Sequence, residues 1–388
     1  MDVLYQPSPM DLDSVSKGKP FLTRDQVCSL VKDNYNFEVK HLKVLDGYDN
    51  QNFLVEVLPQ NEEKGSMVTA EVTVKYVLKI TNSYLSKADQ GLRDVTHLME
   101  FLSTRGFACT HPVPNKYGQL CQLLTFQNLA LENSENGVLA NQKMEDTFMV
   151  RLVTFLPGTV LNDLPLVPDN VFEEMGETLA QVHVAFQELD MDKTGLQEMG
   201  ETSPWSLDCL TKFRKFLYVV EDIEKRRLAE DVMNEFERVV LPRKKELPHG
   251  FLHGDFNDVN MIIDVQDGSK ESHLIGFIDF DDASYSCVVH DIGVSLMYVL
   301  QCKTSSRDSA ARHFLQGYSK YRKMPFVEKD CLLYCIAGRF VQSLLGGLYN
   351  YSVRKDKYVL GTQQRGWDAL KEIWTRGKEV SYQKWKFS

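Results

Sequence analysis

Hydrophobic and polar positions follow two different periods in the two parts of this chain. The first part contains short segments rich in β-branched and aromatic residues, a composition that predicts strands of an antiparallel meander. The segments of the meander cover residues 37–45, 52–58 and 72–80, and residues 119–126 and 147–155 are two further strand candidates. Two polar runs between them, Gln60 to Ser66 and Glu132 to Asp146, predict loops.

Helical spacing of apolar residues dominates from about residue 168 onward. It is clear in residues 171–186 and 228–240, and the most apolar run, Cys331 to Tyr349, predicts a buried helix. Residues 250–284 are the exception, because a loop rich in Gly and Asp there precedes two short apolar strands.

The change of period predicts an α+β protein with two lobes. In the first part, Thr23 and Gln26 have the spacing of a capping box at the start of a helix, and residues 89–104 predict a second helix. Leu156-Pro157-Gly158 ends the last strand. We therefore expect a flexible tail over residues 1–20, an N-terminal lobe over 21–155 and a C-terminal lobe over 156–388.

Composition narrows the class of protein. The chain has 388 residues, a formal net charge of −10, 43% hydrophobic residues and 25% charged residues. This composition is typical of globular proteins, and the charge argues against a nucleic-acid binder, which needs a basic face. No basic start precedes an apolar stretch, and no segment matches the length and purity of a membrane span, so we expect neither a signal peptide nor a membrane partner. Eight cysteines without Cys-x-x-Cys pairs favour reduced thiols in the cytoplasm.

The segment from His253 to Asn260 carries the most informative residues. Asp255 is followed five residues later by Asn260, just ahead of an apolar strand, which places a carboxylate and an amide oxygen at one loop. The carboxylate can accept a proton from an attacking hydroxyl, and the amide oxygen can bind Mg²⁺, which favours oxygen ligands. Asp279, at the end of the next strand, supplies a second metal ligand. A turn capped by Asp and Asn side chains is the alternative interpretation.

A cation on a strand of the first part would complete such a site. Lys79 is the one charged residue in the segment 76–80. A strand lysine is usually solvated, but the acidic residues downstream favour a contact with phosphate. The sequence contains no Gly-x-x-x-x-Gly-Lys-Ser/Thr, Gly-x-Gly-x-x-Gly, Gly-x-Ser-x-Gly or His-Glu-x-x-His motif, so the main rival signatures are missing.

The chain resembles the aminoglycoside phosphotransferase/choline kinase superfamily, whose motif His-Gly-Asp-x-x-x-x-Asn is followed by Ile-Asp-Phe-x-Asp. Both motifs occur, starting at His253 and at Ile278. Within the superfamily the flanking blocks are most similar to the hydroxylysine kinase branch. These blocks cover residues 47–53, 76–80, 150–158, 339–343 and 366–367. The resemblance implies a two-lobed protein-kinase-like fold, with an antiparallel sheet lobe that binds nucleotide and a larger helical lobe that carries catalysis.

The resemblance also implies roles for individual residues. Asp255 is the catalytic base, Asn260 and Asp279 bind Mg²⁺, and Lys79 contacts the α- and β-phosphates of GTP or ATP. Asp291 supports the catalytic loop from the following helix. The other nucleotide contacts fall on the turn at 47–53 and on a hinge whose backbone pairs with the purine, and they are Asn52, Phe53, Thr154, Phe155 and Leu156.

Two positions depart from the superfamily pattern. Asp281 stands where the relatives have the Gly of Asp-Phe-Gly-Asp, a change that alters the metal loop or adds a carboxylate near the phosphates. Asp94 is the nearest acid that could pair with Lys79, although the family usually has a longer Glu or Gln there and Arg93 lies beside it.

The hydroxylysine kinase branch implies 5-hydroxy-L-lysine as acceptor and GTP as donor. Arg339 is a charge inside an apolar helix, so it either pairs with a carboxylate of the protein or binds the carboxylate of the acceptor. Gln342, one turn along, would assist it. Asp258 and Asp282 are predicted to bind the ammonium groups, and Trp367 to form a wall of the pocket.

Other interpretations stay open from the sequence. One is a kinase for another amino alcohol, such as choline or an aminoglycoside-like compound. A second is a catalytically inactive nucleotide-binding scaffold, which would be expected to lack one of the four catalytic and metal-binding residues. A third is a protein kinase, although the Ala-Pro-Glu end of an activation segment is absent. We expect a monomer or a homodimer, and His183, on an apolar helix face, is interpreted as a core histidine.

Overall fold

The computed structural model describes residues 18–47, 49–58, 73–129, 143–265, 272–355 and 357–387. The chain divides into two compact units. The first, here called the sheet unit, contains the described residues up to Ser103 together with Thr110–Phe155. The second, here called the helical unit, contains Thr104–Cys109 and the chain from Leu156 onward.

One antiparallel sheet forms the centre of the sheet unit. Its strand order is β1-β2-β3-β6-β4, and β5 also pairs with β6. The strands are β1 (Val39–Leu45), β2 (Gln51–Val57), β3 (Val74–Ile80), β4 (Pro112–Val113), β5 (Gln122–Leu129) and β6 (Lys143–Thr154). The predicted meander is therefore confirmed, because β1, β2 and β3 pair in sequence order.

One loop prediction is partly wrong. Residues Lys143 to Asp146 belong to β6 and pair with β5, although their polar side chains favoured a loop. Backbone hydrogen bonds to a neighbouring strand do not depend on side-chain polarity, so an outer strand can extend through polar residues. The rest of that predicted loop up to residue 142, the predicted loop at Gln60 to Ser66 and most of the predicted tail lie outside the described residues.

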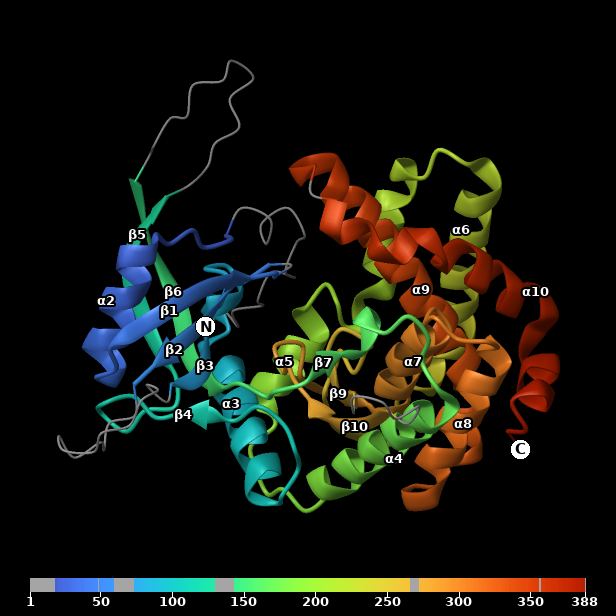
Figure 1. Ribbon diagram of the computed structural model, residues 1–388. Coiled ribbons are helices and arrows are strands. Elements are labelled where there is room, and N and C mark those ends of the chain that lie inside the picture. The colour runs from blue at the N-terminus through green and yellow to red at the C-terminus, as the bar shows by residue number, and fades with distance from the viewer. Residues whose placement is uncertain are drawn as a thin grey trace, which may run out of the picture. The chain divides into compact units, whose positions relative to one another are not determined.

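Helix α2 (Arg24–Tyr35) covers one face of this sheet (Figure 1). The predicted capping box is confirmed, because Thr23 accepts from the backbone of Gln26 and the Gln26 side chain accepts from the backbone of Thr23. Apolar side chains of α2 pack on alternate residues of the strands, such as Leu78 and Ile80 of β3. Lys79, between them, points to the opposite face because successive strand residues alternate. Helix α3 (Asp89–Thr104), the second predicted helix, follows the short helix η1 (Leu85–Lys87).

The helical unit combines seven α-helices with short strands among the described residues. The helices are α4 (Asp169–Phe186), α5 (Thr194–Thr202), α6 (Ile223–Val239), α7 (Val288–Val299), α8 (Arg307–Tyr321), α9 (Phe326–Arg354) and α10 (Gly366–Lys384). The 3-10 helices are η2 (Leu161–Asp163), η3 (Leu207–Val219), η4 (Leu241–Arg243) and η5 (Lys357–Gln364). The strands are β7 (Thr159–Val160), β8 (His249–Leu252), β9 (Met261–Val265), β10 (Ser272–Phe277) and β11 (Ser284–Cys287), which form the small sheets β10-β9-β7 and β11-β8.

Helix α9 is the central helix of the helical unit. It packs against α6, α7, α10, η3 and η5, as expected for a helix that is apolar on all sides. By length and composition Phe326–Val353 is long and apolar enough to cross a membrane, so the expectation that no segment reaches this limit is wrong. Its most apolar window is 83% buried inside the protein, which accounts for the composition.

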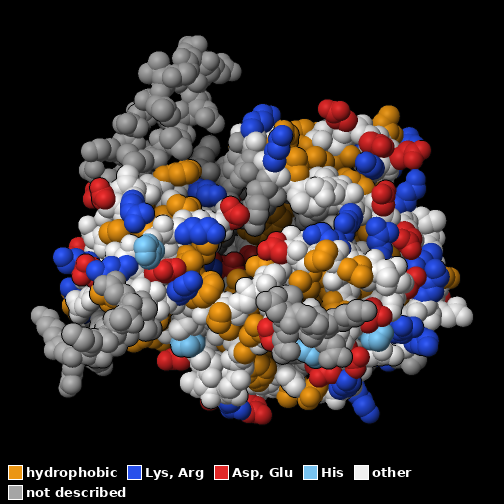
Figure 2. All heavy atoms as spheres, in the orientation of Figure 1, with side chains coloured by type: hydrophobic (Ala, Val, Ile, Leu, Met, Phe, Trp, Pro, Cys, Tyr) orange, Lys and Arg blue, Asp and Glu red, His pale blue; other side chains and the backbone are white. Residues whose placement is uncertain are grey.

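The outer surface of the helical unit carries charges of both signs. On the face shown in Figure 2, Lys and Arg side chains are interspersed with Asp and Glu side chains over this unit. Although the net charge of the chain is −10, this face is not uniformly acidic.

Candidate functional site

The predicted catalytic loop connects β8 to β9 and is anchored from below by Asp291. The backbone N–H groups of His253 and Gly254 donate to the two carboxylate oxygens of Asp291, at 2.8 and 2.9 Å. Asp291 lies in the first turn of α7, so the helix after the loop holds the loop in place, as the sequence predicted.

His183 completes this buried support. Its Nε2 lies 3.0 Å from Asp291, and its Nδ1 lies 2.8 Å from the hydroxyl of Tyr318. Burial opposes ionisation of Asp291, but the hydrogen bond and charge of His183, with the donors from the loop, outweigh it and lower the pKa of Asp291. His183 is a core histidine, as predicted, and it also orients the residue that holds the loop.

Gly254 is required by the conformation of the loop. Its φ is +83°, and a Cβ built there would lie 2.0 Å from the carbonyl oxygen of Asp282. Only glycine accepts this φ and this close approach without strain. The contact places Asp282 directly beside the catalytic loop.

Asp255, Asn260 and Asp279 are brought together as predicted. The Asn260 amide donates to the backbone oxygen of Asp255 at 2.9 Å and to its Oδ2 at 3.0 Å. The N–H of Ile278 donates to the carbonyl of Asn260 at 2.9 Å, so the following residue, Asp279, lies next to Asn260. Asp279 has a φ of +66°, a conformation uncommon for residues other than glycine and often found at functional sites.

The donor atoms of this group suit a magnesium ion. The nitrogen of the Asn260 side chain is engaged by Asp255, so its oxygen is the atom left for a metal, and Asp279 adds a carboxylate. Mg²⁺ binds one or two protein oxygens and takes its other ligands from phosphates and water. In the described part of the chain no group of three or more His, Cys, Asp or Glu residues is placed to hold a metal ion.

Asp255 has the environment of a proton acceptor. Burial raises the pKa of its carboxyl, Arg339 opposes the rise, and Asp279 adds to it. The Nη2 of Arg339 lies 3.1 Å from Oδ1 of Asp255. A raised pKa brings a carboxylate closer to the value that a general base needs near neutral pH.

Arg339 and Gln342 are engaged within the protein. The Arg339 Nη1 donates to the carbonyl of Trp205 at 2.8 Å and to Oε1 of Gln342 at 3.0 Å. Gln342 in turn donates to the carbonyls of Pro204 and Ser206. Pairing with a carboxylate of the protein, one of the two interpretations of Arg339, is the arrangement observed. These bonds give no support to a contact with an acceptor carboxylate.

The other three predicted acceptor residues have different surroundings. Burial raises the pKa of Asp258 to about 6. Burial and the neighbouring Asp255 raise that of Asp282 well above its usual value. The indole of Trp367 donates to Gln363 at 3.0 Å, and among the described residues no hydrogen bond or ring contact joins it to the acidic residues of the loop.

Lys79 and two of its predicted partners lie on the sheet. Lys79 is buried, with 7% of its surface exposed, and pairs across the strands with Asn52 on β2 and Arg151 on β6. Asn52 and Lys79 therefore share a face. Phe53 packs on the other face in the core beneath α2, so only its backbone is available for a nucleotide.

The predicted hinge lies where the chain passes from one unit to the other. The N–H of Thr154 donates to the carbonyl of His111 at 2.9 Å, and the N–H of Phe155 lies 3.4 Å from the carbonyl of Lys75. Leu156 is the first residue of the helical unit after this point. The purine contact of this segment stays a prediction.

Asp94, the acid predicted to pair with Lys79, has a glutamine as a hydrogen-bond partner, and the neighbouring Arg93 does not crowd it. Asp94 is buried on α3 and accepts from Gln90 at 2.8 Å. Arg93 pairs with Asp89 at 2.8 Å and so is directed to a different carboxylate. The pairing of Asp94 with Lys79 stays a prediction.

The sequence did not indicate which aromatic rings lie around Arg339. Its guanidinium lies 5.7 Å from the ring centre of Trp205 and 5.8 Å from that of Tyr298. Tyr298 follows Asp291 by seven residues on α7, two helical turns, so the spacing predicts that both lie on the face turned to the catalytic loop. The carbonyl of Trp205 has no signal in the sequence, because any residue supplies one.

Comparisons with known proteins place the chain in a family. Residues 41–327 match the model of the family described as "Phosphotransferase enzyme family". The chain is 28% identical to hydroxylysine kinase of Xenopus laevis over 380 residues, covering 96% of this chain and 95% of that one. It is 24% identical to homoserine kinase of Bartonella henselae over 337 residues, covering 86% and 85%.

Solved structures show the same fold. An amicoumacin kinase superposes with a TM-score of 0.60 at 16% identity, covering 90% of this chain and 94% of that one. A microcompartment-associated aminopropanol kinase gives 0.59 at 14% identity, covering 92% and 98%. The protein-kinase-like α+β fold is therefore confirmed, with a nucleotide and a divalent metal as its expected ligands. The chain belongs to the phosphotransferase enzyme family and is a small-molecule kinase that acts on a hydroxyl acceptor.

Proposed function

We propose that this kinase transfers the γ-phosphate of GTP, or of ATP, to the hydroxyl of 5-hydroxy-L-lysine. The similarity to hydroxylysine kinases over 95–96% of the chain supports this acceptor. The observation that carries the chemistry is the position of Asp255, which is held between Asn260 and Arg339 in an environment that raises its pKa.

In the proposed reaction Asp255 accepts the proton of the acceptor hydroxyl. The hydroxyl oxygen forms a bond to the γ-phosphorus, while the bond from that phosphorus to the bridging oxygen of the nucleoside diphosphate breaks. A divalent metal held by Asn260 and Asp279 would neutralise charge on the phosphate oxygens. Lys79 would bind the α- and β-phosphates, with Asn52 beside it on the same face of the sheet.

Acidic side chains supply the charge needed for an amine acceptor. Hydroxylysine carries two ammonium groups at neutral pH. Asp258 lies in the catalytic loop and Asp282 lies beside it, and burial raises the pKa of each carboxyl. An ammonium group bound there would offset this unfavourable burial of negative charge. For the compartment we propose the cytoplasm, since all eight cysteines are free thiols.

A coupled assay tests the proposal directly. Release of nucleoside diphosphate is measured with ATP and GTP against 5-hydroxy-L-lysine, homoserine, choline and aminopropanol. We expect the highest kcat/KM with hydroxylysine and GTP, and no turnover without a divalent cation. Comparable kcat/KM for choline would contradict an amino-acid acceptor.

Homoserine is the second candidate acceptor. Several relatives are homoserine kinases, and the match to one of them covers 86% of this chain. Homoserine shares the carboxylate and α-ammonium group of hydroxylysine but lacks the second ammonium group. A higher kcat/KM with homoserine would therefore show that one ammonium site is enough.

A further inference from the structure

A cavity of about 580 Å³ lies in the described part of the helical unit. Its walls come from three segments, namely the chain after η2, the connection from α7 into α8, and the start of α10. The lining residues are Pro165, Leu166, residues 302–308, Arg365 and Glu372. We call this cavity the cationic pocket. Its volume is within the range of small-molecule sites.

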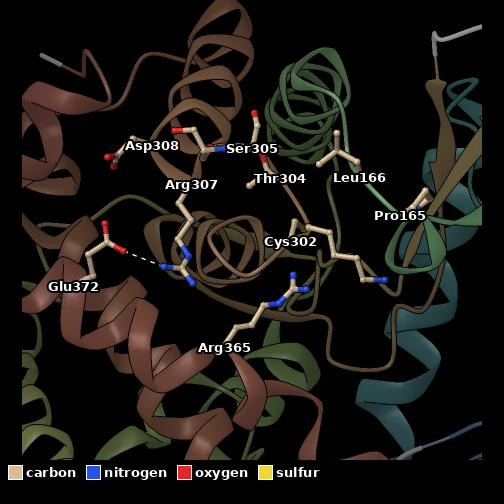
Figure 3. A pocket seen from close by; sticks show the side chains of 11 residues that line it. Pro165, Leu166, Cys302, Thr304, Ser305, Arg307, Asp308, Arg365 and Glu372 are labelled. Carbon is tan, nitrogen blue, oxygen red and sulfur yellow. Dashed lines mark hydrogen bonds and ion pairs between the residues drawn. The ribbon is translucent and has the colours of Figure 1, made fainter.

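Three cations and two acids line the cationic pocket, but the acids are engaged. Figure 3 shows Arg307 and Arg365 extending into the same space from different segments, with Arg307 joined to Glu372. This pair is 3.0 Å long. Asp308 accepts at 2.6 Å from Arg376, a residue outside the lining. The negative charge of the pocket is thus already compensated.

Lys303 and Arg365 supply positive charge, and each donates to a backbone carbonyl. Lys303 Nζ donates to the carbonyl of Asn162 at 2.9 Å, and Arg365 Nη1 donates to that of Gln301 at 3.2 Å. In the ranges that the structure describes, neither forms an ion pair with a carboxylate. Both cations retain unused donors, and an anion in the pocket could accept them in charge-assisted bonds.

The cationic pocket adjoins the catalytic loop through Asn162. The N–H of Asn162 donates to the carbonyl of Asp258 at 3.0 Å, and its carbonyl accepts from Lys303. One residue therefore connects a pocket cation to the loop that carries Asp255.

Helix α7 makes a second connection to the same loop. Tyr298, whose ring lies beside Arg339, accepts at its carbonyl from the N–H of Cys302, a pocket residue, at 3.1 Å. One helical turn separates these two residues, a rise of about 6 Å. Cys302 is therefore one helical turn from a residue that contacts Arg339, the partner of Asp255.

We propose that the cationic pocket binds the carboxylate of the amino-acid acceptor through Lys303 and Arg365. This inference rests on the proposed function and names the group that recognises the end of the acceptor far from the reacting hydroxyl. Arg339, the cation that the sequence suggested for this role, pairs with Asp255 instead. The acceptor then extends from the pocket past Asp258 to Asp255, with its carboxylate next to cations and its ammonium groups next to acids.

The test separates binding from turnover. Lysine has the carboxylate and both ammonium groups but no hydroxyl, and 1,5-diaminopentane lacks the carboxylate as well. Binding of each to the full-length protein with nucleotide and Mg²⁺ is measured by calorimetry for the parent, Lys303→Gln, Arg365→Gln and the double variant. We expect the double variant to weaken lysine binding at least about tenfold and to leave diaminopentane unchanged, because charge-assisted hydrogen bonds are lost. The KM for hydroxylysine should rise by the same factor, with kcat and the nucleotide KM unchanged.

Matched controls remove exposed cations from the same unit. Lys245→Gln and Arg227→Gln delete similar charges away from the pocket and should bind lysine as the parent does. The proposal would be overturned if the double variant weakened the binding of lysine and of diaminopentane equally. It would also be overturned if the parent bound both molecules with the same affinity.

Inorganic phosphate is the third probe. If the double variant abolishes phosphate binding while lysine binding persists, the pocket is a phosphate site instead. If lysine binds as expected but the parent does not phosphorylate hydroxylysine, the acceptor assignment fails and the carboxylate site stands.

Discussion

Aspartates lie in opposite electrostatic environments on two sides of the catalytic loop. We call the side that faces α7 the lower side, and the side that carries the catalytic carboxylates the upper side. Below the loop, Asp291 accepts two backbone N–H groups and the ring of His183, and its pKa is lowered. Above the loop, Asp255 and Asp282 lie close together beside Arg339, and the pKa of each is raised. Both sides are largely buried, so the number of donors decides the direction of the shift.

The comparison shows how a structural carboxylate differs from a functional one. The lower carboxylate has its partners in the folded chain and stays ionised. The upper group has more acids than cations, so it gains free energy when a metal ion, an ammonium group or a proton arrives. Clusters whose pKa values are pushed apart in this way are typical of catalytic sites.

Asp255→Asn should have the largest effect on activity. The change is nearly isosteric but removes the proton acceptor, so we expect kcat to fall by roughly 10²–10⁴-fold. Folding should persist, because Asn can still accept from Arg339 and Asp282 remains near that guanidinium. Steady-state kinetics and the melting temperature check both points. A variant with near-normal kcat would place the base elsewhere, with Asp258 and Asp282 as the next residues to change.

Asp291→Ala should have the largest effect on stability. It leaves two backbone donors and His183 without their buried acceptor, a loss of about 3–5 kcal/mol in the free energy of unfolding. Chemical denaturation measures this loss. Asp368→Ala, which removes an exposed carboxylate from α10, is the matched control and should change stability by no more than about 0.5 kcal/mol. Equal losses in the two variants would refute the special role of Asp291.

Asp279→Asn should have an intermediate effect, seen in the metal dependence. One anionic ligand oxygen becomes neutral, so we expect the Mg²⁺ concentration at half-maximal activity to rise by at least about tenfold. Titration of activity with Mg²⁺ at saturating nucleotide tests this. A titration that coincides with that of the parent would remove Asp279 from the metal site.

Asp258→Asn should have the smallest effect, on the pH dependence of stability. The pKa of Asp258 rises from 3.8 to about 6 on folding, so the folded state binds this proton more tightly. Its contribution to stability is fully present below pH 3.8 and is lost as the pH rises through about 6. The melting temperature of Asp258→Asn should therefore fall less steeply between pH 4 and pH 7 than that of the parent. Parallel curves would show that Asp258 does not titrate in this range.

Much of the fold followed from local patterns. The capping box at Thr23 and the strand at residues 74–80 depend on neighbours in the chain, and both were predicted close to their observed limits. Two expectations were wrong because tertiary contacts override composition. Lys143 to Asp146 extend β6 despite their polarity, since β5 supplies the backbone partners. Helix α9 has the composition of a membrane span because the helical unit surrounds it.

The candidate site also combines contacts between residues close in the sequence with contacts between residues far apart in it. The sequence by itself determined the group of Asp255 and Asn260, because five residues of one loop bring the two side chains together. Only the tertiary structure decided the partner of Arg339, which lies 84 residues from Asp255 along the chain. It also decided the cationic pocket, where Lys303 and Arg365 come from segments whose local patterns carry no sign of each other. Local spacing fixes the distance between side chains on one loop or helix, whereas the distance between separate elements depends on how all the intervening helices pack.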